Sequence, residues 1–335
     1  GQVLTSTGAG SPPAFETIST SDTLSFRNYI INGQFQIWQR ATTSGSVTTD
    51  GYLAADRWRT SASGATYTFS RQEFTLGQTE VPSHPTYFGR FAVTTGDDHV
   101  NIHTRIEDIK RIQGQVTLSF WAKGSNPAGG NIQINRTQNF GSGGSADVQA
   151  EIDTFTVDGT WTKKTFTFTL PSISGKTIGA GSYLGIDFRQ PAGDDGAAAW
   201  TLDITNVQLE LGATATDFEM RSYADELLRC QRYFQAISGR MGSWGSAVAY
   251  STTAAQGWLS IHPEMRANPT FSFTGTIKVE DGGAAYTTSS TTASTTTGPS
   301  GFSWWTGSFS GLTDNNVYYV YGDGNTGYFK LDAEL

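Results

Sequence analysis

The stretch from Trp200 to Phe234 constrains the fold of this chain more than any other segment. It begins with alternating apolar and polar residues, which predict a half-buried strand, and ends in an apolar seam at helical spacing. Gly212 separates the two patterns. Within the strand the apolar positions change phase, which predicts a β-bulge near Thr205 and Asn206.

The helical part is expected to begin at Ser222, because a serine N-cap followed by Asp225 satisfies free amide groups at a helix start. Its apolar seam consists of Tyr223, Leu227, Cys230 and Phe234. A helix of about 12 residues is unstable alone. We therefore expect the seam to pack on the β-sandwich or on the last domain, with a seam between three copies of the chain as the alternative. The single cysteine, Cys230, is expected to be a small buried apolar residue.

The rest of the chain has the pattern of short strands joined by turns. It contains 39 glycines, 13% aromatic residues and only 16% charged residues, a mixture that suits pleated surfaces and tight turns. Strands at this spacing predict a β-sandwich rather than a parallel sheet. The strands expected in the first domain are residues 67–71, 88–94, 100–106, 116–122, 165–170, 183–188 and 199–211.

We divide the chain into four parts. Residues 1–25 are an extended segment rich in Ser, Thr, Gly and Pro, either a flexible linker or a segment that orders by pairing with copies of itself. Residues 26–216 form the large β domain, residues 217–237 a connecting helix and residues 238–335 a smaller C-terminal β domain. In the smaller domain the pattern predicts further strands, a mobile Ser/Thr loop and a closing hairpin: 247–250, 258–261, 270–273 and 276–279, the loop 287–297, and the hairpin 317–321 with 327–331.

Charge and hydropathy exclude several classes. The formal net charge is −8 and no basic stripe is present, which argues against nucleic-acid binding and against anionic membranes. No apolar run approaches the roughly 20 residues of a membrane-spanning helix, and no signal peptide is visible. Because the chain lacks an initiator Met, we expect a fragment of a longer protein or a trimmed one.

The residues that could support catalysis do not form a recognised motif. His99 and His103 are four apart, but in a predicted strand and without the Glu of a zinc-protease helix. The acidic pairs Asp97–Asp98 and Asp194–Asp195 lie in loops, where they more often cap turns than cleave sugars. We therefore expect no catalytic residue, cofactor or metal. A structural Ca²⁺ on Asp194, Asp195 and Asp203 is the alternative, and Asp323–Asn325 is interpreted as a turn.

Aromatic residues outside the core pattern are the better candidates for a site. The candidate ligand-binding residues are Trp121, Trp244, Tyr286, Trp304 and Trp305. Trp121 is out of phase with its apolar neighbours, and the adjacent Trp304 and Trp305 must point to opposite faces of a strand. Exposed indole and phenol rings stack on the C–H faces of sugars. Burial of these rings against a neighbouring subunit is the alternative.

Several segments resemble bacteriophage tail-fibre proteins with a jelly-roll domain similar to a carbohydrate-binding module. They are Gly1–Ile18, Asn28–Arg40, Tyr52–Trp58, His103–Gly124, Val207–Phe234, His262–Phe271 and Phe329–Leu335. The resemblance implies a jelly-roll β-sandwich at residues 26–216, a β-sandwich tip domain and a homotrimer. It implies attachment to a bacterial surface glycan or another receptor, with other virion tail proteins as partners. It supplies no fixed set of binding residues.

Three functions follow from these features. The first is a homotrimeric virion protein that binds a host receptor through several weak sites at once. The second is a structural fibre or baseplate element that contacts only virion proteins. The third is a polysaccharide depolymerase, which would require two carboxylates facing each other across a groove.

Overall fold

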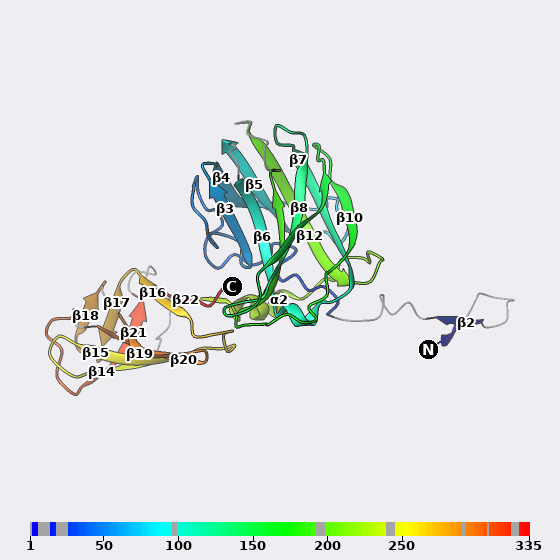
Figure 1. The fold of residues 1–335 in the computed structure, drawn as a ribbon. Helices are drawn as coiled ribbons and strands as arrows, with labels where there is room; N and C mark the ends of the chain where they lie inside the picture. Colours follow the sequence, from blue (N-terminus) through cyan, green and yellow to red (C-terminus); the bar gives the residue numbers. More distant parts are fainter. Residues whose placement is uncertain are drawn as a thin grey trace. The chain divides into compact units, whose positions relative to one another are not determined.

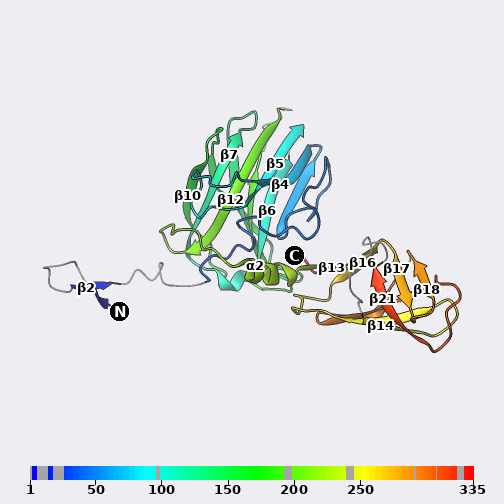
Figure 2. The same cartoon turned by 180° about the vertical axis from the view of Figure 1, so that it is seen from behind.

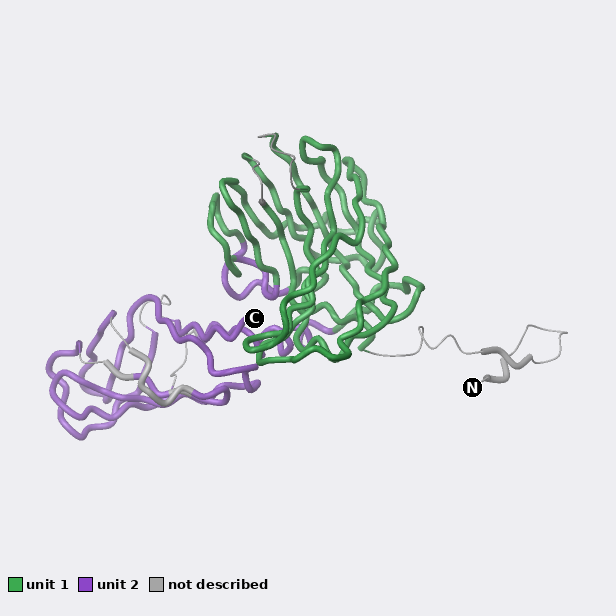
Figure 3. Tube along the Cα trace, in the orientation of Figure 1, with its two compact units in different colours: residues 1–36, 43–53, 58–221 green, residues 37–42, 54–57, 222–335 purple. Residues whose placement is uncertain are grey.

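The computed structural model describes residues 2–5, 14–17, 26–95, 99–191, 198–238, 245–289, 292–306, 308–322 and 328–335. The chain forms two compact units, coloured separately in Figure 3. The first comprises residues 1–36, 43–53 and 58–221, and the second comprises 37–42, 54–57 and 222–335. The second unit therefore includes two short segments, 37–42 and 54–57, from near the start of the expected first domain. Four consecutive parts of the chain cannot describe such a division.

The N-terminal segment forms a small hairpin of its own. Strands β1 (Gln2–Thr5) and β2 (Ala14–Thr17) pair antiparallel, with Gln2 opposite Thr17. Neither the linker nor the self-pairing alternative included this intrachain pairing.

The first unit is a sandwich of two antiparallel five-stranded sheets, seen from opposite sides in Figures 1 and 2. One sheet has the order β10-β7-β12-β5-β4 and the other β3-β6-β11-β8-β9. The strands of the first sheet are β4 (Thr66–Glu73), β5 (Tyr87–Thr95), β7 (Gln115–Ser125), β10 (Thr162–Thr169) and β12 (Trp200–Leu211). Those of the second are β3 (Trp58–Ser63), β6 (His99–Glu107), β8 (Ile132–Asn139), β9 (Val148–Phe155) and β11 (Tyr183–Arg189).

The sequence pattern located this sandwich well. All seven expected strands are present, with ends within a few residues, and the bulge of β12 lies between Thr205 and Gln208. Asn206 adopts a left-handed φ of 51° there, a conformation that Asn tolerates better than most residues. The large buried side chains between the sheets include Trp58, Phe91, Phe120, Phe188 and Trp200. The mainly β fold class is confirmed.

The segment after residue 25 is hydrogen-bonded to the bulged strand β12. The side chain of Asn28 accepts hydrogen bonds from the backbone N–H groups of Ile30 and Leu209 and donates one to the carbonyl of Val207. The amide of Gln34 donates to the side-chain oxygen of Asn206 at 3.0 Å. Bulged residues leave ladder groups unpaired, and these side chains satisfy several of them. Asn28 and Gln34, in the segment Asn28–Arg40 that resembles tail-fibre proteins, therefore have a structural role.

Helix α2 (Tyr223–Gln231) has the predicted start but not the predicted seam. Ser222 caps it by accepting from the backbone N–H of Asp225 at 3.1 Å. Cys230 is fully buried, and burial raises the pKa of its thiol well above the usual value, which agrees with an unreactive apolar residue. The seam prediction was wrong at both ends: Tyr223 is 60% exposed, and Phe234 begins strand β13 because the helix ends one turn earlier than its periodicity suggests.

The second unit contains a three-stranded sheet, β13-β22-β16, and a seven-stranded sheet, β18-β17-β21-β14-β15-β20-β19, which enclose one apolar cluster. The first sheet consists of β13 (Phe234–Ser238), β16 (Thr270–Thr274) and β22 (Tyr328–Asp332). The second consists of β14 (Gly245–Ala249), β15 (Ala255–Ser260), β17 (Ile277–Glu280), β18 (Ala285–Thr288), β19 (Thr292–Gly298), β20 (Gly301–Thr306) and β21 (Val317–Gly322).

Two expectations for this unit were wrong. The closing hairpin does not form, because β21 pairs with β14 and β17 whereas β22 pairs with β13 and β16 in the other sheet. The Ser/Thr tract is not a simple loop, because Thr292–Gly298 pairs with β20 as strand β19. Thr is β-branched and suits a pleated strand, and that preference outweighs the polar composition. Among the described residues, no helix is both long and apolar enough to cross a membrane.

Candidate functional site

The predicted aromatic site residues are distributed over both units. Trp121 on β7 is half-buried and packs on the apolar cluster of Val81, Phe88 and Trp161. Tyr286 on β18 is partly buried against the core of the second unit, with its ring edge-on to Tyr318 at a centroid distance of 5.9 Å. These two rings belong to different units.

The prediction that Trp304 binds a ligand was wrong. Only 1% of its surface is exposed, so its ring is not available to a ligand. Its cross-strand partner is Gly257, and a Cβ added there would lie 2.6 Å from the Trp304 ring. The missing side chain at Gly257 provides the space that the indole fills, and the ring packs into the core. The side chain of Trp305 and the whole of Trp244 lie outside the described residues.

The exposed aromatics of the second unit are others. Trp258 is 53% exposed and Tyr319 is 58% exposed. The exposed Val317 lies on the strand of Tyr319, and its cross-strand partner Val248, also exposed, lies on β14 between β21 and β15. In these strands the alternate residues, such as Ala247 and Tyr318, are buried. The seven-stranded sheet therefore presents an outward face that is partly apolar.

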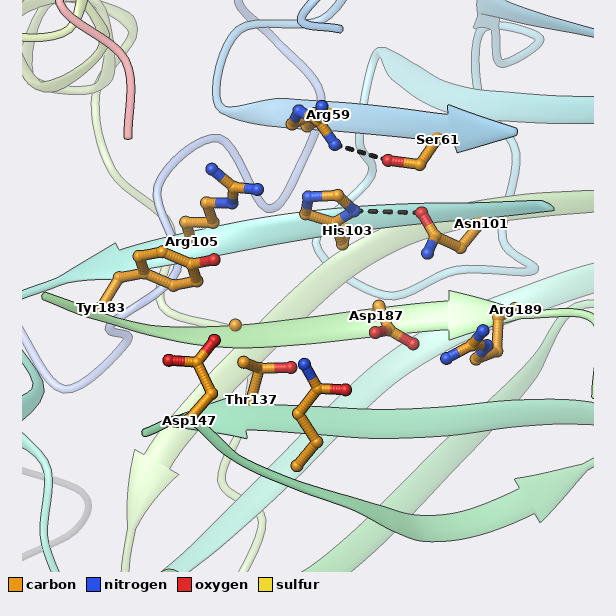
Figure 4. Close-up of a pocket in the computed structure, with 12 residues that line it drawn as sticks. Arg59, Ser61, Asn101, His103, Arg105, Thr137, Asp147, Tyr183, Asp187 and Arg189 are labelled. Carbon is orange, nitrogen blue, oxygen red and sulfur yellow. Dashed lines mark hydrogen bonds between the residues drawn. The ribbon is translucent and has the colours of Figure 1, made fainter. Parts of the chain in front are cut away.

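A polar groove of about 210 Å³ lies on the outward face of the sheet β3-β6-β11-β8-β9 of the sandwich (Figure 4). Successive side chains of a strand point to opposite faces. In β6 and β11 the even-numbered apolar residues are buried in the core, and the odd-numbered residues between them line the groove. The lining residues are Arg59 and Ser61 (β3), Asn101, His103 and Arg105 (β6), Tyr183, Gly185, Asp187 and Arg189 (β11), Thr137 (β8), Asp147, and Gln149 (β9).

The strand register arranges these side chains in rows. Arg59, His103, Asp187 and Asn135 are consecutive cross-strand partners over β3, β6, β11 and β8. In the next row Arg105 is opposite Gly185, which is opposite Thr137. Strands that are far apart in sequence therefore supply one contiguous surface.

Asp187 is the electrostatically unusual residue of the groove. Burial raises the pKa of its carboxyl to about 6, although the positive charge of Arg189 opposes this shift. Its Oδ1 atom is buried and has no hydrogen-bond partner among the described residues. A buried carboxylate oxygen without a donor is costly when the group is charged, which agrees with the raised pKa of this carboxyl.

Tyr183 and Gly185 shape one end of the groove. The Arg105 guanidinium lies 4.6 Å from the centroid of the Tyr183 ring, in a cation–π contact. A Cβ added at Gly185 would meet Thr137 and Tyr183 at 3.5 Å, an ordinary van der Waals contact. Glycine is therefore not required there by the backbone, and its absent side chain keeps the groove floor open.

Hydrogen bonds fix the remaining polar groups. His103 Nδ1 and Asn101 Oδ1 are 3.0 Å apart, as drawn in Figure 4. Asp147 accepts from the amide of Asn139 with both carboxylate oxygens at 3.0 Å. Asn135, with its amide in the orientation that satisfies both of its polar atoms, accepts from Arg189 Nη1 at 3.0 Å. The groove is a preorganised set of donors and acceptors with one aromatic ring.

The described part of the chain contains no cluster of three or more His, Cys, Asp or Glu suited to a metal ion. Asp203, one of the suggested Ca²⁺ ligands, instead accepts two hydrogen bonds from Arg90 at 2.6 and 2.7 Å. The loop acids Asp97–Asp98 and Asp194–Asp195 and the turn Asp323–Asn325 lie outside the described residues.

Sequence reasoning missed the groove although one signal was present. Residues 99–107 alternate polar and apolar side chains, which places Asn101, His103 and Arg105 on one exposed face. The sequence does not indicate that β6 lies between β3 and β11, and that neighbourhood is what converts separate polar residues into a site.

Comparison with known proteins agrees with this fold. Residues 113–179, which include β7 to β10, match a family model described as "Carbohydrate binding domain". No curated protein sequence matches the chain. The match covers 67 of the 335 residues and lies within the sandwich of the first unit, which is therefore similar in part to a carbohydrate-binding domain.

Similar solved structures include a phage protein and two carbohydrate-binding modules. The enzymatically active domain of bacteriophage CBA120 tailspike protein 4 is 16% identical, with 56% of this chain and 22% of that chain covered and a TM-score of 0.34. The family 11 module of the Clostridium thermocellum cellulase Lic26A-Cel5E is 15% identical (52% and 98% covered, TM-score 0.31). The cellulose-binding domain of Cellulomonas fimi β-1,4-glucanase C is 18% identical (51% and 96% covered, TM-score 0.31). The match spans about a fifth of the tailspike chain, and the link to it is distant.

Proposed function

We propose that this protein is a bacteriophage tail-fibre protein of the virion that attaches to a glycan on a bacterial surface through the groove of its sandwich. The observation that carries this proposal is the groove itself, on a sandwich of the carbohydrate-binding-module type. The resemblance of Asn28–Arg40 and the other motifs to tail-fibre proteins supports the phage context. Binding to another kind of surface receptor is the remaining outcome of the tests below.

The groove offers the contacts that a sugar needs. The carboxylate of Asp187 is an acceptor for a ring hydroxyl, and Asn101, Thr137 and Gln149 add donors and acceptors along the groove. The Tyr183 ring provides an apolar surface for the C–H face of a sugar. A site of about 210 Å³ suits one or two sugar rings, so each single contact is weak.

Weak single sites become firm attachment when several act together. We propose a homotrimer held on the virion by other tail proteins, so that three grooves contact one cell surface. Sedimentation equilibrium of the purified chain tests this part. A mass near three times 36.1 kDa is expected, and a monomer at micromolar concentration counts against the multivalent mechanism.

The glycan proposal is tested with two matched glycine substitutions. Gly185→Val adds a β-branched side chain to the groove floor, which a strand accepts well. Gly159→Val is the control, because a Cβ at Gly159 meets nothing within 4 Å. Glycan-array and host-cell adsorption assays should show at least a tenfold loss for Gly185→Val and none for Gly159→Val. Equal binding by both variants would show that ligands bind elsewhere.

The outward apolar face of the second unit favours a structural role as a second candidate. Val248, Trp258, Val317 and Tyr319 are exposed there, and such faces are common at protein contacts. Tyr319→Ser separates the two functions: lost virion assembly with intact glycan binding supports the structural role. Alanine at Trp304 does not separate them, because that buried side chain supports the fold.

We propose that the protein does not cleave its glycan. The depolymerase alternative has one observation in its favour: Asp147 and Asp187 line the same groove, and a carboxyl with a pKa near 6 is suited to a general acid. Release of reducing ends from a bound polysaccharide, abolished by Asp187→Asn, would establish cleavage. Unchanged polysaccharide after prolonged incubation is the expected result.

A further inference from the structure

One side of the groove is cationic, and we propose that it selects a glycan with an anionic substituent, a carboxylate or a phosphate, bound by Arg59 and Arg105. This inference rests on the glycan function proposed above and adds the chemical class of the sugar. Three arginines line the groove together with two aspartates, although the chain as a whole has a net charge of −8. The net charge of the chain therefore does not attract anionic glycans, and selection of an acidic glycan must come from the arginines of the groove.

The sheet register brings the two arginines to one place. Arg59 on β3 is the cross-strand partner of His103 on β6, and Arg105 is two residues further along β6 on the same face. Diagonal neighbours of this kind are within reach of each other when the side chains are long. Figure 4 shows Arg59 on one strand, and Arg105 and His103 side by side on the next.

The guanidinium group suits this task. Arg presents several N–H donors in a planar fork that matches carboxylate and phosphate oxygens, and such charge-assisted bonds are about twice as strong as neutral ones. The Arg105 guanidinium lies over the Tyr183 ring, 4.6 Å from its centroid, and this contact holds the cation at one end of the groove. An anionic substituent that reaches this end therefore meets a positioned guanidinium group.

The acidic groups of the groove give the ligand a direction. Asp187 and Asp147 lie on the β11–β8–β9 side, where they accept hydroxyl donors, and the charge of Arg189 on β11, which donates to Asn135, acts on Asp187. Asp50 accepts from Arg59 Nη2 at 3.4 Å, so it competes for one nitrogen of that arginine. The anionic substituent is therefore expected toward β3 and β6, and the neutral hydroxyls toward Asp187.

The experiment compares acidic glycans with neutral counterparts of the same backbone. The probes are polygalacturonate, alginate and hyaluronan, each with its carboxyl-reduced form, and a phosphomannan with its dephosphorylated form. Affinity electrophoresis or titration calorimetry measures binding of the full chain at 50 and 300 mM NaCl. We expect at least tenfold tighter binding to one acidic member than to its neutral form, with the difference reduced at high salt. The pair that shows it distinguishes carboxylate from phosphate.

Variants assign the selectivity to the groove. Arg59→Gln and Arg105→Gln should each lower affinity for the acidic form about tenfold and affinity for the neutral form by a clearly smaller factor, so that the selectivity for the acidic form falls. Arg111→Gln is the control, since Arg111 is outside the groove with a side chain 74% exposed. Arg105→Lys retains the charge and should restore part of the selectivity, which a merely structural role of Arg105 does not predict.

Two results would overturn the inference. Equal binding to acidic and neutral forms, abolished by Gly185→Val, removes the anionic selectivity and retains glycan binding in the groove. If Arg→Gln variants with unchanged circular dichroism lower the affinities for the acidic and the neutral glycan equally, the arginines do not bind the anionic substituent. Absence of binding to every probe and to host cells counts against the groove as a glycan site altogether.

Discussion

Asp187→Asn should make the sandwich more stable at neutral pH while it weakens glycan binding. Burial raises the pKa of the Asp187 carboxyl from 3.8 to about 6, a shift of roughly two units. At 1.36 kcal/mol per unit, the folded state loses about 3 kcal/mol when this group ionises. Asn mimics the protonated acid in size and lacks the charge, so it avoids that loss.

The sign and the pH window follow from the direction of the shift. Because the folded pKa is raised, the favourable contribution of protonated Asp187 is fully present below pH 3.8 and is lost as the pH rises through about 6. The difference in unfolding free energy between variant and parent should therefore grow by about 2.4 kcal/mol between pH 4 and pH 7.5. The groups that face Asp187 are His103 from β6, Arg189 on its own strand and the neutral Asn135 from β8.

The measurement must report on the sandwich alone, because the chain has two units. Urea denaturation with pulsed hydrogen exchange on peptides from β6 and β11 meets this need. Parallel pH profiles for the two proteins would refute the reasoning, because they would show that Asp187 has an ordinary pKa in the folded state. A gain in stability together with weaker glycan binding is the trade-off expected at a binding site.

Three further substitutions test the packing argument. Trp304→Ala should destabilise the second unit by about 3–5 kcal/mol and leave glycan binding unchanged; a soluble, fully stable variant in thermal unfolding would contradict the burial of this ring. Arg90→Ala should cost about 2–3 kcal/mol in urea denaturation, because Asp203 is 2% exposed and loses both of its bonds from the partly exposed Arg90; a change below 0.5 kcal/mol would argue against this pair. Asn28→Ala should lower the free energy of unfolding by about 1–3 kcal/mol and speed hydrogen exchange at Leu209, whose N–H loses its acceptor. Unaltered exchange at Leu209 would show that Asn28 does not stabilise the bulged strand.

Local patterns were sufficient wherever a residue's environment depended on its near neighbours in sequence. Alternation located seven of the ten sandwich strands and did not indicate β3, β8 and β9; the phase change located the bulge at Thr205, and Ser222 marked the start of the helix. They failed where the partner was remote. The sheet assignment of β22 and the pairing of β19 depend on strands that the sequence does not identify as neighbours.

The candidate site shows the same division. The sequence by itself determined that Asn101, His103 and Arg105 share one polar face of a strand, because side chains alternate with a period of two. Only the tertiary structure placed Arg59 and Asp187 on either side of that face, since β3, β6 and β11 are separated in the chain and are joined by hydrogen bonds across the sheet. The same applies to Trp304: its sequence neighbours leave its orientation open, and the missing side chain of Gly257 on the adjacent strand decides that the ring is buried.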